Sequence, residues 1–304
     1  MSKTMIIDVH CHYSRSPVQN SSYIHTIGKM WGVEKPIGDI QHHLSKFEGD
    51  TYYHKLVEDM DRSGVDASVL FFFDNIGDGE NDEQVLKQNK HLADIEQRHP
   101  KRIISFASVD PRRKIAPDLF RTCIEEYRLR GLKWHPDIGY YPNSPEAYQV
   151  LEVAEELDVP LLIHTGPLLG FRSKHSHPIH LDDVALDFPK LKIIAAHMGD
   201  TWWRDWVAIA KYKKNIYGDL AIWQLMAGRE LGRFRWVLRE IIDDVGVKQV
   251  LFASDTPAFE SHISNRRWVE ILRALPDDSS DGIKFSEKEV EAILGGNAAK
   301  VLNL

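Results

Sequence analysis

The chain has 304 residues, of which 43% are hydrophobic and 27% charged, so it can bury a large core. Its formal net charge of −7 argues against a partner such as nucleic acid or an anionic membrane surface. The two cysteines, Cys11 and Cys123, are too few for a disulfide framework. Because the N-terminus shows no signal-peptide core and no 18 apolar residues run together, we expect a cytoplasmic protein without a membrane span.

Short apolar runs rich in β-branched residues predict eight strands, with a helical pattern after each of them. The expected strands cover residues 5–10, 68–73, 103–109, 131–135, 160–165, 192–197, 216–220 and 250–255. The expected helices cover residues 52–63, 81–98, 115–130, 144–157, 180–187, 202–213, 228–244 and 262–274. Strict alternation of strand and helix indicates parallel strands, and eight repeats close a barrel. The sequence therefore predicts an α/β fold, a (β/α)8 TIM barrel, in a single domain over residues 1–304.

Two segments extend this pattern. Residues 13–51 form a long loop after the first strand and carry histidines and aromatic residues without a helix or strand period. Long insertions of this kind at a barrel mouth are typical of lids, so we expect a lid or a contact with a partner subunit there. After the eighth helix, Ser286 and Glu289 have the spacing of a capping box, which predicts a C-terminal helical tail over residues 284–304.

Five polar residues lie at the ends of predicted strands. His10 and His12 close the first strand, His164 the fifth, His197 the sixth and Asp255 the eighth. The carboxyl ends of barrel strands meet at one mouth, and His-X-His in a strand places both imidazoles on one face. Imidazole and carboxylate are ligands of divalent metals, so we expect a metal site for Zn²⁺, with Mn²⁺, Fe²⁺ or Ni²⁺ as alternatives.

The fourth predicted strand adds a lysine to this mouth. Alternation places Lys133 and His135 on one face and Trp134 on the other. If the shared face is the inner one, Lys133 is a buried cation beside metal ions, which is unfavourable unless its charge is removed. Reaction with carbon dioxide would give a carbamate that bridges two metals. Alternatively, Lys133 stays an ammonium that anchors a substrate carboxylate.

These motifs resemble those of the amidohydrolase superfamily, and particularly of its amidohydrolase-related branch. The resembling stretches are residues 8–12, 160–166, 196–199, 252–257 and 296–299. By this resemblance, the primary metal ligands would be His10, His12, His164 and Asp255. His197 would bind a second metal in two-metal members, or act as a catalytic histidine in one-metal members.

The resemblance leaves the number of ions open. The stretch Gly131–Pro136 is similar to the one that carries a carboxylated lysine in two-metal members such as urease. The branch also includes one-metal decarboxylases that resemble aminocarboxymuconate semialdehyde decarboxylase and lack that lysine bridge. We therefore expect either one or two ions per chain.

The leading functional interpretation is a metal-dependent hydrolase that acts on a small carboxylated or cyclic substrate, at an amide, lactone or ester bond, through metal-activated water. Asp255 would accept the proton of that water, and His197 would stabilise an oxyanion or shuttle protons. The alternative is a non-oxidative decarboxylase, a carbon–carbon lyase, of a small aromatic or muconate-like acid. A barrel that only binds a partner is disfavoured, because all five metal positions are filled.

Further residues are candidates for contact with a small-molecule substrate: His135, Arg172, His177, Trp202 and Arg15. Arg15 belongs to the expected lid, and the indole of Trp202 could wall a flat substrate. Asp219 and Asp110 could also face the pocket, although the sequence does not separate a role in the site from hydrogen bonding in the core. A homodimer is a plausible assembly, because the long first loop carries aromatic residues.

Overall fold

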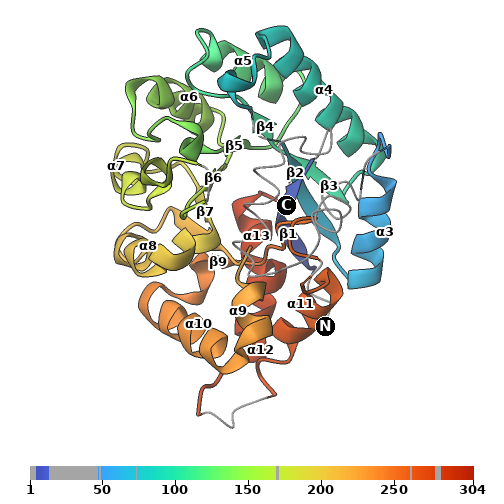
Figure 1. Cartoon of the computed structure of the whole chain (residues 1–304), viewed down its shortest axis with the longest axis vertical. Coiled ribbons are helices and arrows are strands. Elements are labelled where there is room, and N and C mark those ends of the chain that lie inside the picture. The colour runs from blue at the N-terminus through green and yellow to red at the C-terminus, as the bar shows by residue number, and fades with distance from the viewer. Residues whose placement is uncertain are drawn as a thin grey trace.

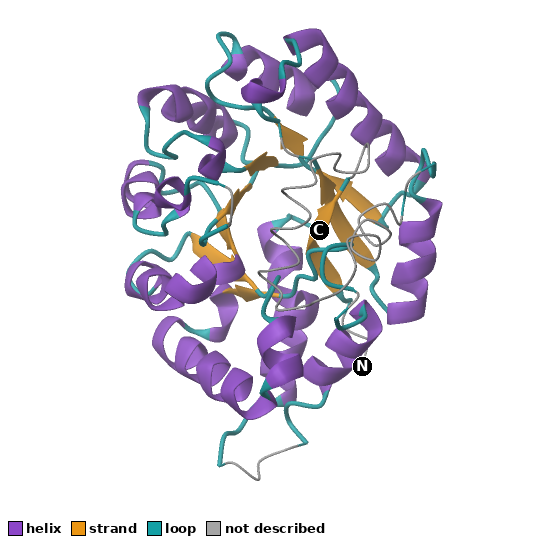
Figure 2. Ribbon diagram, in the orientation of Figure 1, coloured by secondary structure: helices purple, strands orange, loops and turns teal. Residues whose placement is uncertain are grey.

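The computed structural model describes residues 5–13, 47, 49–72, 74–168, 171–260, 262–277 and 282–304. The expected lid, residues 13–51, falls mostly outside these ranges, as does Arg15. Figures 1 and 2 show the described chain as a ring of helices around a ring of strands. This is the predicted (β/α)8 TIM-barrel architecture.

All the strand segments pair in parallel. They are β1 (Ile7–His12), β2 (Ala67–Phe71), β3 (Ile103–Ser105), β4 (Ala107–Ser108), β5 (Leu132–Trp134), β6 (Leu161–His164), β7 (Ile193–Ala196), β8 (Ile216–Asp219) and β9 (Val250–Leu251). Hydrogen bonds join them in two sheets, β1–β2–β3 and β4 through β9. The segments β3 and β4 are two halves of the predicted third strand, interrupted at Phe106, so the nine segments correspond to eight barrel strands.

The first and last strands meet and close the ring. The Val9 N–H donates to the carbonyl of Phe252 at 3.1 Å, and the His12 N–H donates to the carbonyl of Thr256 at 2.8 Å. Cys11 and Thr256 also form a parallel bridge. The end of β9 therefore lies against β1, which brings the last strand to the two histidines of the first.

The outer helices follow one another around the strands in chain order (Figure 1). They are α3 (His54–Ser63), α4 (Asp82–Arg98), α5 (Ala116–Glu125), α6 (Pro145–Glu156), α7 (His180–Asp187), α8 (Trp203–Ala210), α10 (Leu231–Val245) and α11 (Asn265–Arg273). The prediction that the last of these begins at residue 262 is wrong, because Ser264 caps it by accepting the N–H of Arg267 at 3.3 Å. None of the described helices is long and apolar enough to cross a membrane.

Short helices occur at the strand ends. The 3-10 helices are η1 (Ile76–Asp78), η2 (Pro136–Ile138), η3 (Ser173–Ser176), η4 (His197–Trp202) and η5 (Val247–Gln249). A further helix, α9 (Gln224–Arg229), follows β8 and was not predicted. It starts without a side-chain cap and spans six residues, so it gives little periodic signal in the sequence.

The C-terminal tail braces the bottom of the barrel. It consists of α12 (Glu287–Glu291), the π-helical turn η6 (Ala292–Gly296) and α13 (Asn297–Val301), and the predicted capping box of Ser286 and Glu289 is present. At Gly295 a Cβ atom would lie 1.8 Å from the carbonyl oxygen of Met5, so only glycine permits this approach to the start of β1. Ala298 joins the apolar cluster inside the barrel.

A β-bulge aims the histidines of β1 at the barrel interior. Ile7 and Val9 belong to the inner apolar cluster. Asp8 pairs with Ser68 of β2, and Cys11, three residues later, pairs with Leu70, only two residues later. β1 therefore contains one extra residue between Asp8 and Cys11. His10 consequently follows Val9 into the interior instead of alternating to the outside. Asp8 supports this bulge, because its carboxylate accepts the N–H of His10 at 3.1 Å and that of Ser254 at 3.0 Å.

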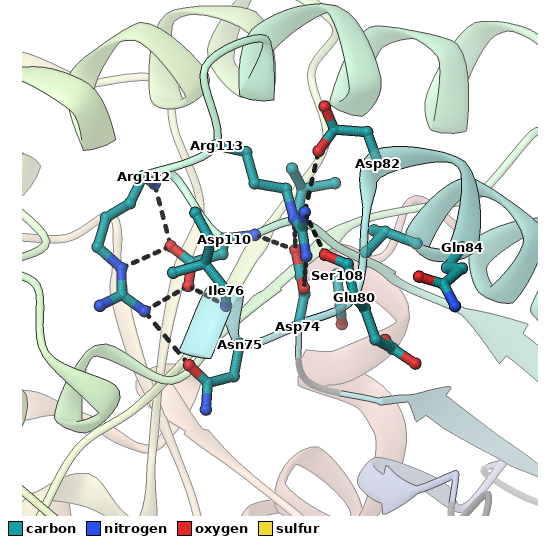
Figure 3. Close-up of polar contacts among 12 residues, drawn as sticks. Asp74, Asn75, Ile76, Glu80, Asp82, Gln84, Ser108, Asp110, Arg112 and Arg113 are labelled. Atoms are coloured by element: carbon teal, nitrogen blue, oxygen red, sulfur yellow. Dashed lines mark hydrogen bonds and ion pairs between the residues drawn. The ribbon is translucent and has the colours of Figure 1, made fainter. Parts of the chain in front are cut away.

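Ion pairs fix the loops that follow β2 and β4 at the same end of the barrel (Figure 3). The buried guanidinium of Arg113 donates to both carboxylate oxygens of Asp74, at 2.5 and 2.7 Å, and to Asp82 at 2.9 Å. Asp74 also accepts the N–H of Asp110 at 2.8 Å, and Asp110 pairs with Arg112. The two loops are therefore held together by charged groups rather than by apolar packing.

This arrangement predicts a large effect of Arg113→Ala. The variant leaves the carboxylate of Asp74 buried without its partner, and we expect the free energy of unfolding to fall by about 3 kcal/mol. Denaturant unfolding measures this difference. Arg121→Ala is the matched control, since Arg121 also pairs with two carboxylates but lies on the surface, and it should leave stability nearly unchanged. Equal effects of the two substitutions would contradict this interpretation.

Candidate metal centre

Five histidine rings form a closed circuit at the carboxyl end of the strands. Going around it, the ring centroids are 5.1 Å apart for His12 and His10, 5.0 Å for His10 and His197, and 5.0 Å for His197 and His164. The circuit continues with 4.7 Å from His164 to His135 and 6.3 Å from His135 back to His12. The histidines come from the ends of β1, β5, β6 and β7, so the predicted mouth brings them together.

Three of the predicted ligands form a compact triangle of donor atoms. His10 Nε2 lies 3.2 Å from His12 Nε2, and Asp255 Oδ1 lies 2.9 Å from His12 Nε2 and 3.6 Å from His10 Nε2. Ligands in a tetrahedral zinc site at about 2.0–2.1 Å from the ion lie about 3.3 Å from each other. The three residues therefore fit a first-row divalent ion without rearrangement.

His164 and His197 form a second pair beside this triangle. His197 Nε2 lies 3.2 Å from His164 Nδ1. The His197 ring is also close to His10, so it connects the triangle to His164. Two imidazole nitrogens that face each other at this distance also have the spacing of ligands to one ion.

Both residues predicted to do chemistry have left-handed backbone conformations. Asp255 has a φ of 58°, and His197 begins a run of four left-handed residues that ends at Asp200. Such conformations cost about 1–3 kcal/mol each in non-glycine residues and persist where surrounding contacts enforce them. At His197 these contacts are the Trp223 Nε1–H, which donates to the His197 carbonyl at 2.8 Å, and Asp219, which accepts the His197 N–H at 2.8 Å.

The protonation states suit a metal. Burial and the nearby ammonium of Lys133 hold the pKa of His10 and His135 well below the usual range, and burial does the same to the pKa of His164. Burial alone would raise the pKa of Asp255, but the facing imidazoles of His10 and His12 outweigh it and hold this pKa well below its ordinary value. Neutral imidazoles and an ionised carboxylate are the forms that bind a divalent ion.

Lys133 approaches the circuit at His10, and the neighbouring Trp134 packs on the helical side of the strand. Its Nζ is 3.3 Å from His10 Nε2 and 4.3 Å from the centroid of the Phe71 ring. Burial lowers the pKa of Lys133 to about 8, although carboxylates including Asp219 oppose the shift. A substantial fraction of this amine is neutral at slightly alkaline pH, which is the form that reacts with carbon dioxide.

Two buried carboxylates approach the outer nitrogens of the histidines. Asp219 Oδ2 lies 2.9 Å from His10 Nδ1. Asp137 in η2 lies 3.2 Å from His135 Nδ1 through Oδ1 and 3.9 Å from His164 Nε2 through Oδ2. The sequence analysis missed Asp137, and the one available signal was its spacing, since it continues the alternation of Lys133 and His135. Asp219 was considered without being assigned to the site.

The other predicted substrate residues lie on the loops around the mouth. The ring of His177 packs against Trp202 with centroids 4.5 Å apart, and both residues are half-buried. Arg172 has an exposed side chain, and its N–H donates to the carbonyl of Asp137 at 2.8 Å. Arg15 lies outside the described residues. The structure thus places His135 in the circuit of histidine rings, whereas His177, Trp202 and Arg172 lie in the surrounding loops.

A cavity of about 740 Å³ opens among the loops around the mouth, and none of the five histidines lines it. Its walls come from the loops after β6, β7 and β8 and include the apolar side chains of Phe171, Ile222 and Met226. Arg229 and Arg233 contribute positive charge, and Asp200 and Glu230 contribute negative charge. The volume is in the range of small-molecule sites.

The comparisons with known proteins give a family and a fold. A family model described as amidohydrolase matches residues 7–304. No curated protein matches the sequence. Solved structures match over nearly their whole length at identities below 25%, so they support the fold alone.

Three of these structures illustrate the range. The 5-carboxyvanillate decarboxylase of Sphingomonas paucimobilis has a TM-score of 0.68 and 16% identity, covering 99% of this chain and 100% of its own. The dihydroxybenzoic acid decarboxylase of Polaromonas sp. JS666, with bound manganese and 2-nitroresorcinol, has a TM-score of 0.69 and 18% identity, with coverages of 99% and 98%. The 4-oxalomesaconate hydratase of Rhodopseudomonas palustris has a TM-score of 0.64 and 20% identity, with coverages of 98% and 96%.

The triangle predicts which substitutions remove a metal. We expect His12→Ala and Asp255→Asn each to weaken divalent-ion binding about 100-fold or more. Residues that only orient a metal ligand already lower the metal affinity by about 10–100-fold when they are replaced, and loss of the ligand itself should lower it at least as much. Elemental analysis of protein purified without chelator measures ions per chain. His177→Ala is the control, because His177 packs against Trp202 rather than in the triangle. Similar metal loss in all three variants would contradict the assignment.

Proposed function

The chain belongs to the amidohydrolase family, and from this premise we propose that it is a metal-dependent hydrolase of a small carboxylated or cyclic substrate. The scissile bond is an amide, lactone or ester. The observation that carries the proposal is the triangle of His10, His12 and Asp255, which joins two neutral imidazoles to one ionised carboxylate. A bound divalent ion supplies Lewis-acid activation of a carbonyl and of water.

In this proposal His10, His12 and Asp255 hold the first ion. His164, which faces His197 beside the triangle, is the fourth ligand when only one ion is bound. Zn²⁺ is the first choice for this donor set, because imidazole and carboxylate in compact arrangements suit zinc. Mn²⁺ is the second, since the Polaromonas decarboxylase binds manganese in the same fold. Fe²⁺ and Ni²⁺ also accept imidazole ligands.

Proton transfer falls to Asp255 and His197. Oδ1 of Asp255 is one corner of the triangle. The other oxygen, Oδ2, is therefore the candidate to accept a proton from the attacking water and to deliver it to the leaving group. His197 lies between His10 and His164 with its backbone held on both sides. From this position its imidazole stabilises the developing oxyanion or relays a proton.

Lys133 decides between one and two ions. As a neutral amine it reacts with carbon dioxide to form an N–C bond, and one proton leaves to give an anionic carbamate. The carbamate would supply anionic oxygen ligands next to His10, and His164 and His197 would supply imidazole ligands for a second ion. Its lowered pKa and its 3.3 Å approach to His10 support this role.

The alternative function is a metal-dependent, non-oxidative decarboxylase. It is favoured by the structural similarity to decarboxylases of 5-carboxyvanillate and dihydroxybenzoic acid. In this alternative Lys133 stays an ammonium that binds the substrate carboxylate, and His197 or Asp255 protonates the carbon that loses carbon dioxide.

Product masses separate the two functions. Protein reconstituted with Zn²⁺ or Mn²⁺ is incubated with carboxylated lactones, amides and esters and with hydroxybenzoic and muconate-like acids. Hydrolysis adds one water to the substrate, whereas decarboxylation removes one carbon dioxide. We expect Asp255→Asn to lower the rate of hydrolysis by about 10²–10⁴-fold. Carbon dioxide release without uptake of water would replace the hydrolase with the decarboxylase.

The state of Lys133 gives an independent prediction. With ¹³C-bicarbonate in the buffer, we expect a carbamate resonance in the ¹³C NMR spectrum of the wild-type protein, and none for Lys133→Met, which keeps an unbranched side chain but has no amine. The same preparation should hold two ions per chain, falling to one in the variant. One ion and no carbamate in the wild-type protein would favour the ammonium role of Lys133 and hence decarboxylation.

A further inference from the structure

The geometry points to Asp219 as a positioning residue that acts on the metal centre through His10. We propose that its carboxylate fixes the imidazole hydrogen of His10 on Nδ1, so that Nε2 is bare and directed at the metal position. The same carboxylate holds the backbone of His197. The inference rests on the proposed function only in taking His10 as a ligand.

The contacts of Asp219 leave little freedom. Its side chain is fully buried at the carboxyl end of β8. Oδ2 lies 2.9 Å from His10 Nδ1, while Oδ1 accepts the N–H of His197 at 2.8 Å and the N–H of Ala221 at 3.1 Å. Three donors from three strand ends therefore meet on one carboxylate, which is consistent with an ionised acceptor.

A second group of three residues, His10, His197 and Asp219, also has the spacing of metal ligands. Both oxygens of Asp219 are nevertheless engaged by hydrogen-bond donors, and Nδ1 of His10 is engaged with Asp219. We therefore assign Asp219 to orienting the ligand rather than to binding the ion.

Two contacts on opposite sides of the His10 ring agree on the position of its hydrogen. A neutral imidazole carries one N–H, and a carboxylate can only accept, so the contact with Asp219 places the hydrogen on Nδ1. On the other side, Nε2 lies 3.3 Å from Nζ of Lys133, a distance at which the lysine N–H can donate to it. With its hydrogen on Nδ1, Nε2 is an acceptor, which is the state required of a metal ligand.

The anchoring of His197 gives Asp219 a second effect. His197 has a φ of 65°, and both of its backbone polar groups are paired, the N–H with Asp219 and the carbonyl with Trp223. These bonds hold the His197 ring between His10 and His164. A displacement of the Asp219 carboxylate would move the ligand and the proton-transfer residue together.

Asp219→Asn tests this assignment with almost no change in shape. The two N–H groups of His197 and Ala221 require the amide oxygen, because the reverse orientation would leave two buried donors facing an NH₂ group. The amide NH₂ then faces His10 Nδ1, which must become an acceptor. The hydrogen of His10 moves to Nε2, and the nitrogen directed at the metal is no longer free to bind it.

The experiment has two readouts on the full chain. The first is the tautomer of His10 in metal-stripped protein, from long-range ¹H–¹⁵N NMR correlations of labelled histidine, assigned with His10→Ala. The second is the affinity for Zn²⁺ and Mn²⁺ by titration. We expect Nδ1–H in the wild-type protein, Nε2–H in Asp219→Asn, and an affinity about 10–100-fold lower in that variant.

Asp66→Asn is the matched control. Its carboxylate accepts the N–H of Ile6 at 2.8 Å, at the other end of the same strand as His10, and touches no histidine of the circuit. We expect this variant to keep the wild-type tautomer and metal affinity. An equal loss in both variants would indicate a general loosening of β1 and overturn the inference.

The readouts also separate this inference from the proposed function. Nε2–H in the wild-type protein, or an unchanged tautomer and affinity in Asp219→Asn, would overturn the role of Asp219 even if the chain is a hydrolase. If Asp219→Asn does not fold, the wild-type tautomer still decides. Nδ1–H in a wild-type protein that binds no divalent ion would support the orientation by Asp219 and reject the metal-dependent function.

Discussion

Burial of imidazoles at one end of the barrel is the constraint on which the site depends, since four of the five rings are buried and only His12 is partly exposed. A positive charge on His10, His135 or His164 would be desolvated and repelled by the ammonium of Lys133, so these rings are held neutral. Each neutral ring has one nitrogen that accepts. Which nitrogen this is depends on the buried carboxylates behind the circuit, above all Asp219.

Left-handed backbone and buried charge also occur at the mouth. Asp255 and His197 both have positive φ. A hydrogen bond from the His197 N–H to Asp219 of β8 holds the backbone of His197, and the ion pair of Arg113 and Asp74 fixes the adjacent loops. The apolar barrel thus provides rigidity, while a shell of buried polar contacts sets the geometry of the donor atoms.

The sequence predicted the barrel well, because its signals are local. Alternating apolar residues and helix caps such as Ser144 located the strands and most helices within a few residues. The approach of His12 to Asp255 followed from the rule that parallel strands end at one mouth. The bulge at Asp8 did not follow, because it appears only when β1 is paired with β2. The choice of partner for each histidine, including Asp137, likewise depends on distances between strands far apart in the sequence.

The most direct test of the account is to locate the metal by anomalous diffraction from crystals of protein loaded with Zn²⁺ or Mn²⁺. The account predicts an ion bonded to His10 Nε2, His12 Nε2 and Asp255, with His10 Nδ1 still facing Asp219. An ion bound elsewhere, or none within bonding distance of these three residues, would contradict it.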